Sequence, residues 1–432
     1  MIVGATLVAF ALMLAMMLIG IPIAVAMLIV GMGGGVIAYG MPFINSVASV
    51  IWGVQNESLL TAIPMFVLLG ELLLRSGIAD RMYLALSAWL ARLPGGLLHT
   101  NIGCCALFAA TSGSSVATAA TIGTVALPSL HQRGYSMRHA LGTLAAGGTL
   151  GILIPPSVNL IIYGSLTNNS IGKLFIAGLI PGVLLTLLFM AYIFATHVGR
   201  DAGLVQPEAD VPYAQRLRLL VHLVPPLIVF GVVMGSLYFG IATATESAAL
   251  GVSIALVFAW RSGHLSFSML QTCFHQTARI SGMILLIITA AFILNLTISL
   301  TGVADALTKW VTSFGLTAIS LLFALIVFYL ILGMFMDVLS MQVATIPLTY
   351  PIVTALGVDP IWYGVFIVLM CELGMITPPV GMNLFVVHGI RPDKGDIRDA
   401  IWGALPYALM MILFTILLIF APQIVTWLPE RM

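Results

Sequence analysis

The chain has 432 residues, of which 61% are hydrophobic and 7% are charged, and its mean hydropathy is +1.14. Soluble domains carry about 25% charged residues, so this composition excludes an independently soluble protein and a disordered chain. The 16 Lys and Arg are balanced by 15 Asp and Glu, which leaves no basic surface for nucleic acid. The composition therefore predicts a polytopic integral membrane protein.

Apolar segments long enough to cross a bilayer recur along the whole chain. A membrane-spanning helix needs about 20 residues. By this criterion we predict ten full spans, at residues 2–20, 22–39, 59–76, 140–164, 175–196, 222–240, 245–260, 280–300, 361–388 and 400–421. The fold class expected from the sequence is thus an all-α polytopic membrane protein.

A hydrophilic segment at residues 197–221 lies near the midpoint and divides the chain into halves at 1–196 and 222–432. The halves share motifs at a nearly constant separation. Three pairs of positions lie 225, 223 and 225 residues apart: Gly77 and Gly302, Pro155 and Pro378, and Pro181 and Pro406. We therefore predict that the chain contains two copies of one structural unit.

The distribution of basic residues predicts that the two units are inverted in the membrane. Cytoplasmic loops are enriched in Lys and Arg. Arginines cluster at 75–92 and 133–138 in the first half, whereas the second half is basic at 391–398, where the first-half counterpart has only Lys173. The bias thus reverses between two inverted-topology repeats of about five spans each. This arrangement predicts a cytoplasmic linker and periplasmic N- and C-termini.

Two apolar segments interrupted by small or polar residues occupy matching places in the halves, at about 97–130 and 316–350. To satisfy the charge distribution, each must begin and end on the same side of the membrane, so we predict two re-entrant hairpins. Amphipathic pieces at about 77–93 and 302–315 precede them and are predicted to lie in the interface. Small residues at the hairpin centres would also suit close helix packing.

Paired prolines interrupt two predicted spans near their centres. Pro155-Pro156 lies within the broken helix at about 140–164, and Pro378-Pro379 within the one at about 361–388. Consecutive prolines remove two backbone donors and disfavour helix in the residue before them, which leaves carbonyl oxygens without partners. Interruptions at corresponding positions of two repeats are typical of a transporter binding site.

Four acidic residues lie in apolar surroundings, where a charge is costly and needs a reason. Asp337, at the centre of the second hairpin, is the preferred site acid. Glu372 precedes the second proline pair and is interpreted as supporting that break. Glu246 fits either a site or a helix N-cap, and Glu71 fits a structural or subunit-interface role. No ATP-binding or catalytic motif is present, which predicts a protein that is not an enzyme.

Five motifs resemble the large permease subunit of TRAP (tripartite ATP-independent periplasmic) transporters. They follow the family order over nearly the whole chain: Ser112–Ala120, Arg133–Tyr135, Ile154–Ser157, Thr245–Gly251 and Thr377–Gly381. The resemblance implies an elevator mechanism, in which a transport domain of hairpins and broken helices slides against a scaffold. It also implies Na⁺-coupled import of a small organic acid, such as a C4-dicarboxylate or sialic acid.

The resemblance further implies a bacterial inner-membrane location and two protein partners, a small TRAP membrane subunit and a periplasmic substrate-binding protein. The only expected cofactor is Na⁺ at two sites, without ATP, an organic cofactor or nucleic acid. Two other readings remain open: a binding-protein-independent ion-coupled symporter and a channel. Uptake by the chain alone would indicate the symporter, and uncoupled current would indicate the channel.

Carried onto this sequence, the resemblance places one Na⁺ site between the first hairpin and the first break. Its expected ligands are Ser112, Gly113, Ser115, Pro155, Ser157 and Asn159. The second Na⁺ site is expected at Asp337, Ser340, Thr377, Pro378 and Gly381. The expected substrate-binding residues are Ser114, Ser115, Asn159, Asp337 and Asn383. Neither break contains an arginine, so a substrate carboxylate would meet hydroxyls, amides and helix N-termini.

Overall fold

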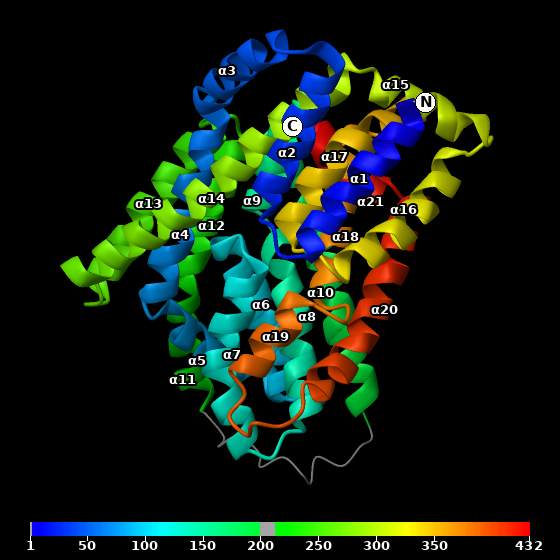
Figure 1. The fold of residues 1–432 in the computed structure, drawn as a ribbon. Helices are drawn as coiled ribbons and strands as arrows, with labels where there is room; N and C mark the ends of the chain where they lie inside the picture. Colours follow the sequence, from blue (N-terminus) through cyan, green and yellow to red (C-terminus); the bar gives the residue numbers. More distant parts are fainter. Residues whose placement is uncertain (1, 199–211) are drawn as a thin grey trace.

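The computed structural model describes residues 2–198 and 212–432, and all regular elements in these ranges are helical (Figure 1). The first half contains α1 (Ile2–Leu18), α2 (Ile23–Tyr39), α3 (Pro42–Gln55), η1 (Ser58–Thr61), α4 (Ala62–Arg75), α5 (Ile78–Leu90), α6 (Leu97–Ser112), α7 (Ser115–Gln132), α8 (Met137–Leu153), α9 (Val158–Thr167) and α10 (Ile171–His197). The second half contains α11 (Tyr213–Leu219), η3 (Leu220–Leu223), α12 (Val224–Tyr238), α13 (Ala244–Arg261), α14 (Phe267–Leu300), α15 (Val303–Ser313), α16 (Ala318–Gly333), α17 (Val338–Ala355), α18 (Pro360–Met375), α19 (Met382–Gly389), α20 (Arg398–Phe420), α21 (Gln423–Thr426) and η4 (Pro429–Arg431).

The polytopic all-α prediction is confirmed, whereas the number of spans stays a prediction. Within the described residues, six helices are long and apolar enough to cross a membrane, or up to eight spans if two bent helix pairs are included. The helices α1 and α2 have 17 residues each, so they are about 25 Å long, slightly less than the hydrocarbon core of a bilayer. The ten predicted spans include these shorter helices.

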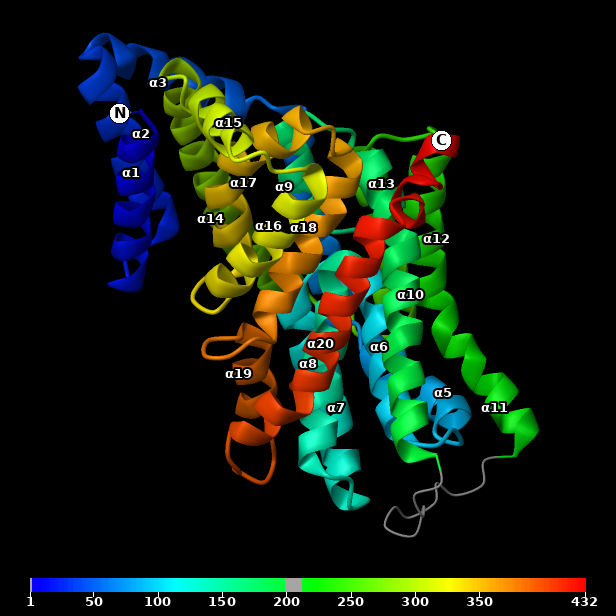
Figure 2. The same ribbon diagram turned by 90° about the vertical axis from the view of Figure 1, so that its right-hand side faces the viewer.

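Each of the two predicted hairpin segments forms a helix pair; Gly113 in the first turn is buried, whereas Phe335 and Asp337 in the second are exposed, and the re-entrant arrangement in a membrane stays a prediction. The pair α6–α7 turns at Gly113 and Ser114, and the pair α16–α17 turns between Gly333 and Val338. In Figures 1 and 2 the open end of α6–α7 lies at the bottom and that of α16–α17 at the top. Both chain termini lie at the top, while the end of α10 lies at the bottom. The placement of these faces relative to a bilayer stays a prediction.

Both proline pairs separate two helices. The first lies between α8 and α9, which are bent by 41° relative to each other, and the second between α18 and α19. Both Pro155-Pro156 and Pro378-Pro379 peptide bonds are cis. The predicted amphipathic pieces form α5 and α15, and α15 meets α16 at an angle of 111°.

Three helical segments differ from the sequence-based expectation. Residues 42–55 form α3, which was not predicted, and α14 begins at Phe267 rather than near 280. The first turns of α14 carry the polar residues Gln271, His275 and Arg279, so a search for long apolar segments does not include these turns in the helix. The helix nevertheless begins there, with Ser266 as its cap. Residues 199–211 of the predicted linker lie outside the described residues. The rest of the linker includes α11, which packs on α5.

The helices pack in two groups, which touch each other through contacts of α6 with α4 and α12. In one group, α14 packs against α2, α3 and α4, while α13 packs against α4 and α12. In the other group, α8 contacts α6, α7, α18, α19 and α20, so it occupies the centre. The crossing of α8 and α20 requires glycines, because a Cβ at Gly403 would lie 2.0 Å from the carbonyl oxygen of Arg138. Buried aromatic rings, including Tyr163 and Tyr363, join α9 to α18.

Candidate functional site

The first hairpin tip is a sharp turn between α6 and α7. Gly113 ends α6 in the left-handed region with φ of 60°, a conformation that glycine adopts without strain. Ser114 caps α7, because its Oγ accepts a hydrogen bond from the Ala117 amide at 3.4 Å. The hydroxyls of Ser112 and Thr118 are 2.8 Å apart and join the two arms of the hairpin. The tip therefore presents hydroxyls, carbonyls and a helix N-terminus.

This tip contacts the first helix break closely. A Cβ at Gly113 would lie 2.8 Å from the carbonyl oxygen of Pro156, and a Cβ at Gly151 would lie 2.7 Å from that of Ser114. The carbonyls of Gly151 and Ile152 lose their usual helical donors at the break, because Pro155 and Pro156, four residues later, have no N–H. The structure thus brings the first tip against the first break, while the set of Na⁺ ligands stays a prediction.

Two more predicted residues lie just after this break. Ser157 is fully buried and caps α9 by accepting a hydrogen bond from the Leu160 amide at 3.4 Å. Asn159 is 3% exposed, and its Nδ2 has no hydrogen-bond partner within the described residues. Because burying an unpaired amide is costly, this side chain is suited to a ligand that accepts a hydrogen bond from its Nδ2.

The second hairpin tip is organised by its own aspartate. Asp337 caps α17, because its carboxylate accepts hydrogen bonds from the amides of Leu339 at 3.1 Å and Ser340 at 3.3 Å. The Ser340 hydroxyl also donates to this carboxylate. Asp337 is exposed, unlike the buried Ser340. A helix cap gives Asp337 a structural role, and its predicted role as a ligand remains to be tested.

The second break lies beside the second tip. A Cβ at Gly333, which ends α16, would lie 2.6 Å from the Cα of Gly374 in the last turn of α18. Within the break, the Thr377 hydroxyl donates to the carbonyl of Leu373 at 2.6 Å, and Gly381 precedes α19 with φ of 26°. Thr377, Pro378 and Gly381 therefore lie on one short segment next to the hairpin.

Two side chains of the second half reach into the first. The Ser115 hydroxyl, at the start of α7, donates to Oε1 of Glu372, which is fully buried in α18. Asn383 in α19 donates from Nδ2 to the carbonyl of Ala145 at 3.3 Å, while its Oδ1 lacks a partner within the described residues. A Cβ at Gly148 would lie 2.9 Å from this Nδ2 and 3.3 Å from the Ser115 carbonyl oxygen. The two breaks and the first tip thus interlock.

Sequence reasoning did not single out Gln342, a buried polar side chain. This side chain in α17 is fully buried, and neither its Oε1 nor its Nε2 has a partner in the described part of the chain. The ring contact between Tyr163 and Tyr350 places α9 beside α17. In the sequence, the only signal for this residue was a single amide side chain among apolar residues, about one turn after Asp337.

The other intramembrane acids have local explanations. Glu246 forms a capping box with Thr243 at the start of α13, which confirms the N-cap alternative for this residue. Glu71 pairs with Arg75 at 3.3 Å on the same helix. These contacts account for both carboxylates without a bound ion.

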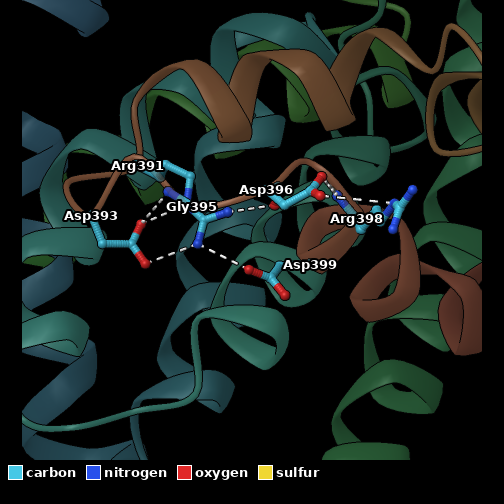
Figure 3. A network of polar contacts seen from close by, with 6 residues as sticks. All are labelled: Arg391, Asp393, Gly395, Asp396, Arg398 and Asp399. Atoms are coloured by element: carbon cyan, nitrogen blue, oxygen red, sulfur yellow. Dashed lines mark hydrogen bonds and ion pairs between the residues drawn. The ribbon is translucent and has the colours of Figure 1, made fainter.

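An ion-paired loop holds the far end of the second broken helix (Figure 3). The Arg391 guanidinium donates to Asp393 at 2.6 and 2.9 Å, to Asp399 at 3.0 Å and to the Asp396 carbonyl at 2.6 Å. Hydrogen bonding from Arg391 lowers the pKa of Asp393, and Asp393 in turn raises the pKa of Arg391. A Cβ at Gly123 in α7 would overlap the side chain of Ile390, so this loop fixes α19 against α7.

The donor chemistry around the tips suits a hard cation. Hydroxyl, amide, carbonyl and carboxylate oxygens bind Na⁺ or other hard cations, whereas transition metals favour His and Cys. No group of three or more His, Cys, Asp or Glu suited to a metal occurs in the ranges that the structure covers. The buried Asn159 and Glu372 atoms without partners fit a ligand that contributes a positive charge or a hydrogen-bond acceptor.

Comparisons with known proteins identify the family. Residues 10–424 match the model of the tripartite ATP-independent periplasmic transporter, DctM component. The C4-dicarboxylate TRAP transporter large permease protein DctM of Vibrio cholerae is 31% identical, with 97% of this chain and 96% of that protein covered. The sialic acid TRAP transporter permease protein SiaT of Haemophilus influenzae is 32% identical, with 86% of this chain and 60% of that protein covered.

Among solved structures, the YdaH transporter of Alcanivorax borkumensis has a similar fold, with a TM-score of 0.61. It is 16% identical in sequence, and the match covers 88% of each chain, so it supports the fold alone. The relatives with similar sequences are named as transporter permeases and not as enzymes. The chain belongs to the DctM component, or large permease, family of tripartite ATP-independent periplasmic transporters.

Proposed function

We propose that this chain is the permease of a Na⁺-coupled, binding-protein-dependent importer of a small organic acid that works by an elevator mechanism. The observation that carries the proposal is the contact of two hairpin tips with two broken helices, where buried polar atoms of Asn159, Glu372 and Asn383 have no hydrogen-bond partner among the described residues. Backbone interruptions at membrane depth require a protein-lined or water-filled site. A transported ion and solute would complete that bonding.

In this proposal each tip and its break hold one Na⁺. The first ion is bound by Ser112, Gly113, Ser115, Pro155, Ser157 and Asn159, and the second by Asp337, Ser340, Thr377, Pro378 and Gly381. Hydroxyls, exposed carbonyl oxygens and the Asp337 carboxylate supply the hard oxygen ligands that replace the ion's water. Neighbouring ion sites would let the Na⁺ gradient supply the energy of uptake, together with about 2.3 kcal/mol per charge for each 100 mV of membrane potential.

The substrate in this proposal is an acid bound between the tips. Ser114, Ser115, Asn159, Asp337 and Asn383 would contact it. The relatives are named for C4-dicarboxylates and sialic acid, which are both carboxylic acids. Helix N-termini favour anions, and α7 and α9 both begin near the first break with buried or half-buried serine caps.

The elevator proposal rests on the division of the helices into two packing groups. The group around α14 would be the scaffold, and the group around α8 would be the moving domain. A cavity lined mainly by apolar side chains lies between α6 and α10 on one side and α12 on the other, with Ala106, Val183 and Phe230 among its lining residues. An apolar boundary without ion pairs would let one group slide past the other at low cost.

The proposal also includes the inverted repeats, a bacterial inner-membrane location, a small membrane subunit and a periplasmic substrate-binding protein. The family name supports a three-part assembly. A cysteine placed in the 197–221 linker, in a cysteine-free background, tests the proposed orientation. We expect an impermeant maleimide added outside intact cells to leave it unlabelled, and outside labelling would contradict periplasmic termini.

Reconstitution tests the function directly. The chain and its small subunit are placed in proteoliposomes, and the purified binding protein with radiolabelled C4-dicarboxylate or sialic acid is added outside. We expect accumulation only with an inward Na⁺ gradient and the binding protein. Uptake without the binding protein would favour the simple symporter, and ohmic Na⁺ current without coupled uptake would favour a channel.

A further inference from the structure

Glu372 lies where the two halves of the protein meet. Residues Trp362–Met375 of α18 are buried, and Glu372 itself has no exposed surface. One carboxylate oxygen accepts the hydrogen bond from Ser115 in the first hairpin tip. The other oxygen has no partner in the described part of the chain. The second half therefore places an incompletely bonded carboxylate against the tip of the first.

Within the described residues, no Lys, Arg or His side chain forms an ion pair with Glu372. The backbone amide of Ile152, in the last turn of α8 before the first proline pair, faces the carboxylate. The carbonyls of Gly151 and Ile152 cannot receive helical hydrogen bonds from Pro155 and Pro156. In the described residues, Arg75, Arg391 and Arg398 form ion pairs with other acids, namely Glu71, Asp393, Asp396 and Asp399.

A buried carboxylate stays ionised only beside a positive partner, because burying an unpaired charge is very costly. Resting on the Na⁺-coupled function proposed above, we propose that Glu372 is a ligand of the Na⁺ bound at the first hairpin tip. Its free oxygen binds the ion directly, and its other oxygen orients the Ser115 hydroxyl. A carboxylate from the second half thus completes an ion site whose other ligands come from the first half.

The second site supports this assignment by its similarity. Ser115 and Ser340 both lie in the first turn of the second helix of their hairpin, α7 and α17. Each serine donates to a carboxylate, from Ser115 to Glu372 and from Ser340 to Asp337. With Glu372 included, each of the two ion sites contains one carboxylate, which balances the charge of one Na⁺.

A purely structural role for Glu372 makes a different prediction. Ser115 is the first residue of α7, so the carboxylate also lies near the positive end of that helix dipole. If this were its whole function, removing the charge would destabilise the protein equally with and without Na⁺. A role in the ion site links the charge of Glu372 to the Na⁺ concentration, whereas a purely structural role does not.

The test uses Na⁺ alone as the probe. Detergent-purified wild type, Glu372→Gln and the matched control Glu246→Gln are unfolded thermally while NaCl replaces choline chloride at constant ionic strength. Gln retains a capping box at position 246. We expect Na⁺ to stabilise wild type and the control at the same half-saturating concentration, and Glu372→Gln to need at least about tenfold more Na⁺, the cost of losing one charged ligand.

The outcomes separate this inference from the proposed function. If wild type is stabilised by Na⁺ and Glu372→Gln responds at the same concentration, the ligand role is overturned while Na⁺ coupling stands. If wild type shows neither Na⁺ stabilisation nor Na⁺-dependent uptake, the proposed function fails. Should Glu372→Gln not fold, Glu372→Asp keeps the charge one methylene further away; weaker Na⁺ binding then supports the assignment, and unchanged binding contradicts it.

Discussion

The serine hydroxyls at the two hairpin tips donate hydrogen bonds to carboxylates that lie at very different distances along the chain. Ser340 donates to Asp337, three residues earlier in the same turn, whereas Ser115 donates to Glu372, which is 257 residues away. The second tip is therefore organised locally, and its aspartate is exposed. The first tip is completed only when the second half packs against it. The two tips thus reach similar chemistry, through a local contact in one and a tertiary contact in the other.

The segments that follow the two broken helices, α9 and α19, are also held in different ways. The first, α9, ends at Asn168 with a φ of 54°, and α10 begins at Ile171. The second, α19, is followed by an eight-residue loop from Ile390 to Ile397 that depends on the ion pairs of Arg391. One exit is fixed by a tight turn and the other by electrostatic contacts.

The largest effect is expected where the first tip touches its break. In Gly151→Ala the new methyl group would lie 2.7 Å from the Ser114 carbonyl oxygen and 2.8 Å from the Ser115 Cα. Backbone atoms cannot move aside as a flexible side chain does, so we expect a loss of about 3 kcal/mol in stability and no uptake. Thermal unfolding in detergent and proteoliposome uptake measure both effects.

Gly282→Ala is the control for this substitution. Gly282 lies in α14 with no heavy atom within 4 Å of a new Cβ. Alanine is the better helix former, so this variant should be at least as stable as wild type. Equal stability of the two variants would contradict the close contact between tip and break.

The next effect tests the loop after α19. Arg391→Ala removes the donors to Asp393, Asp399 and the Asp396 carbonyl, and we expect a loss of about 2 kcal/mol at pH 7, measured by thermal unfolding. The control Arg398→Ala should cost less than about 0.5 kcal/mol, because Arg398 is 79% exposed and lies 3.8 Å from Asp396. A similar loss in both variants would show that Arg391 does not hold the loop.

The pH dependence of this effect has a defined sign. Arg391 lowers the pKa of Asp393 below its ordinary value of 3.8. The stabilisation is therefore complete above the ordinary value and is lost as the pH falls through the lower pKa of the folded protein. We expect the unfolding temperatures of wild type and Arg391→Ala to converge below pH 3.8, and a constant difference would contradict the ion pair.

A smaller effect is expected for single ligands of the first site. Ser115→Ala and Asn159→Ala should raise the Na⁺ concentration for half-maximal uptake by about tenfold, equivalent to about 1.4 kcal/mol, with little change in expression. The physical reason is that each removes one oxygen from a cation that has shed its water. Unchanged Na⁺ activation in both variants would count against the first Na⁺ site.

The smallest effect separates the two roles of Asp337. Asp337→Ala removes the cap of α17 and should cost about 1 kcal/mol in stability, whereas Asp337→Asn retains a good cap. If Asp337 is also a ligand, Asp337→Asn should still impair Na⁺-dependent uptake, because an amide is neutral. Normal uptake by this stable variant would make Asp337 a structural residue only.

Sequence reasoning predicted the elements whose signals are local. The proline pairs identified both breaks because proline lacks a backbone donor wherever it stands. The small polar residues around Gly113 indicated the first tip, and the capping alternative for Glu246 was confirmed because a capping box needs residues only three apart. By contrast, the start of α14 was missed because the search for apolar segments leaves out helical turns with polar side chains, such as the turn around His275.

The sequence by itself determined that this chain is a membrane protein with broken helices in matched positions, because hydropathy and proline geometry act over a few residues. Only the tertiary structure decided which groups meet there. It placed Glu372 on Ser115, Asn383 against α8 and Gln342 in a buried position without partners. These contacts join residues more than 200 positions apart or depend on the packing of several helices, and no local pattern specifies such packing.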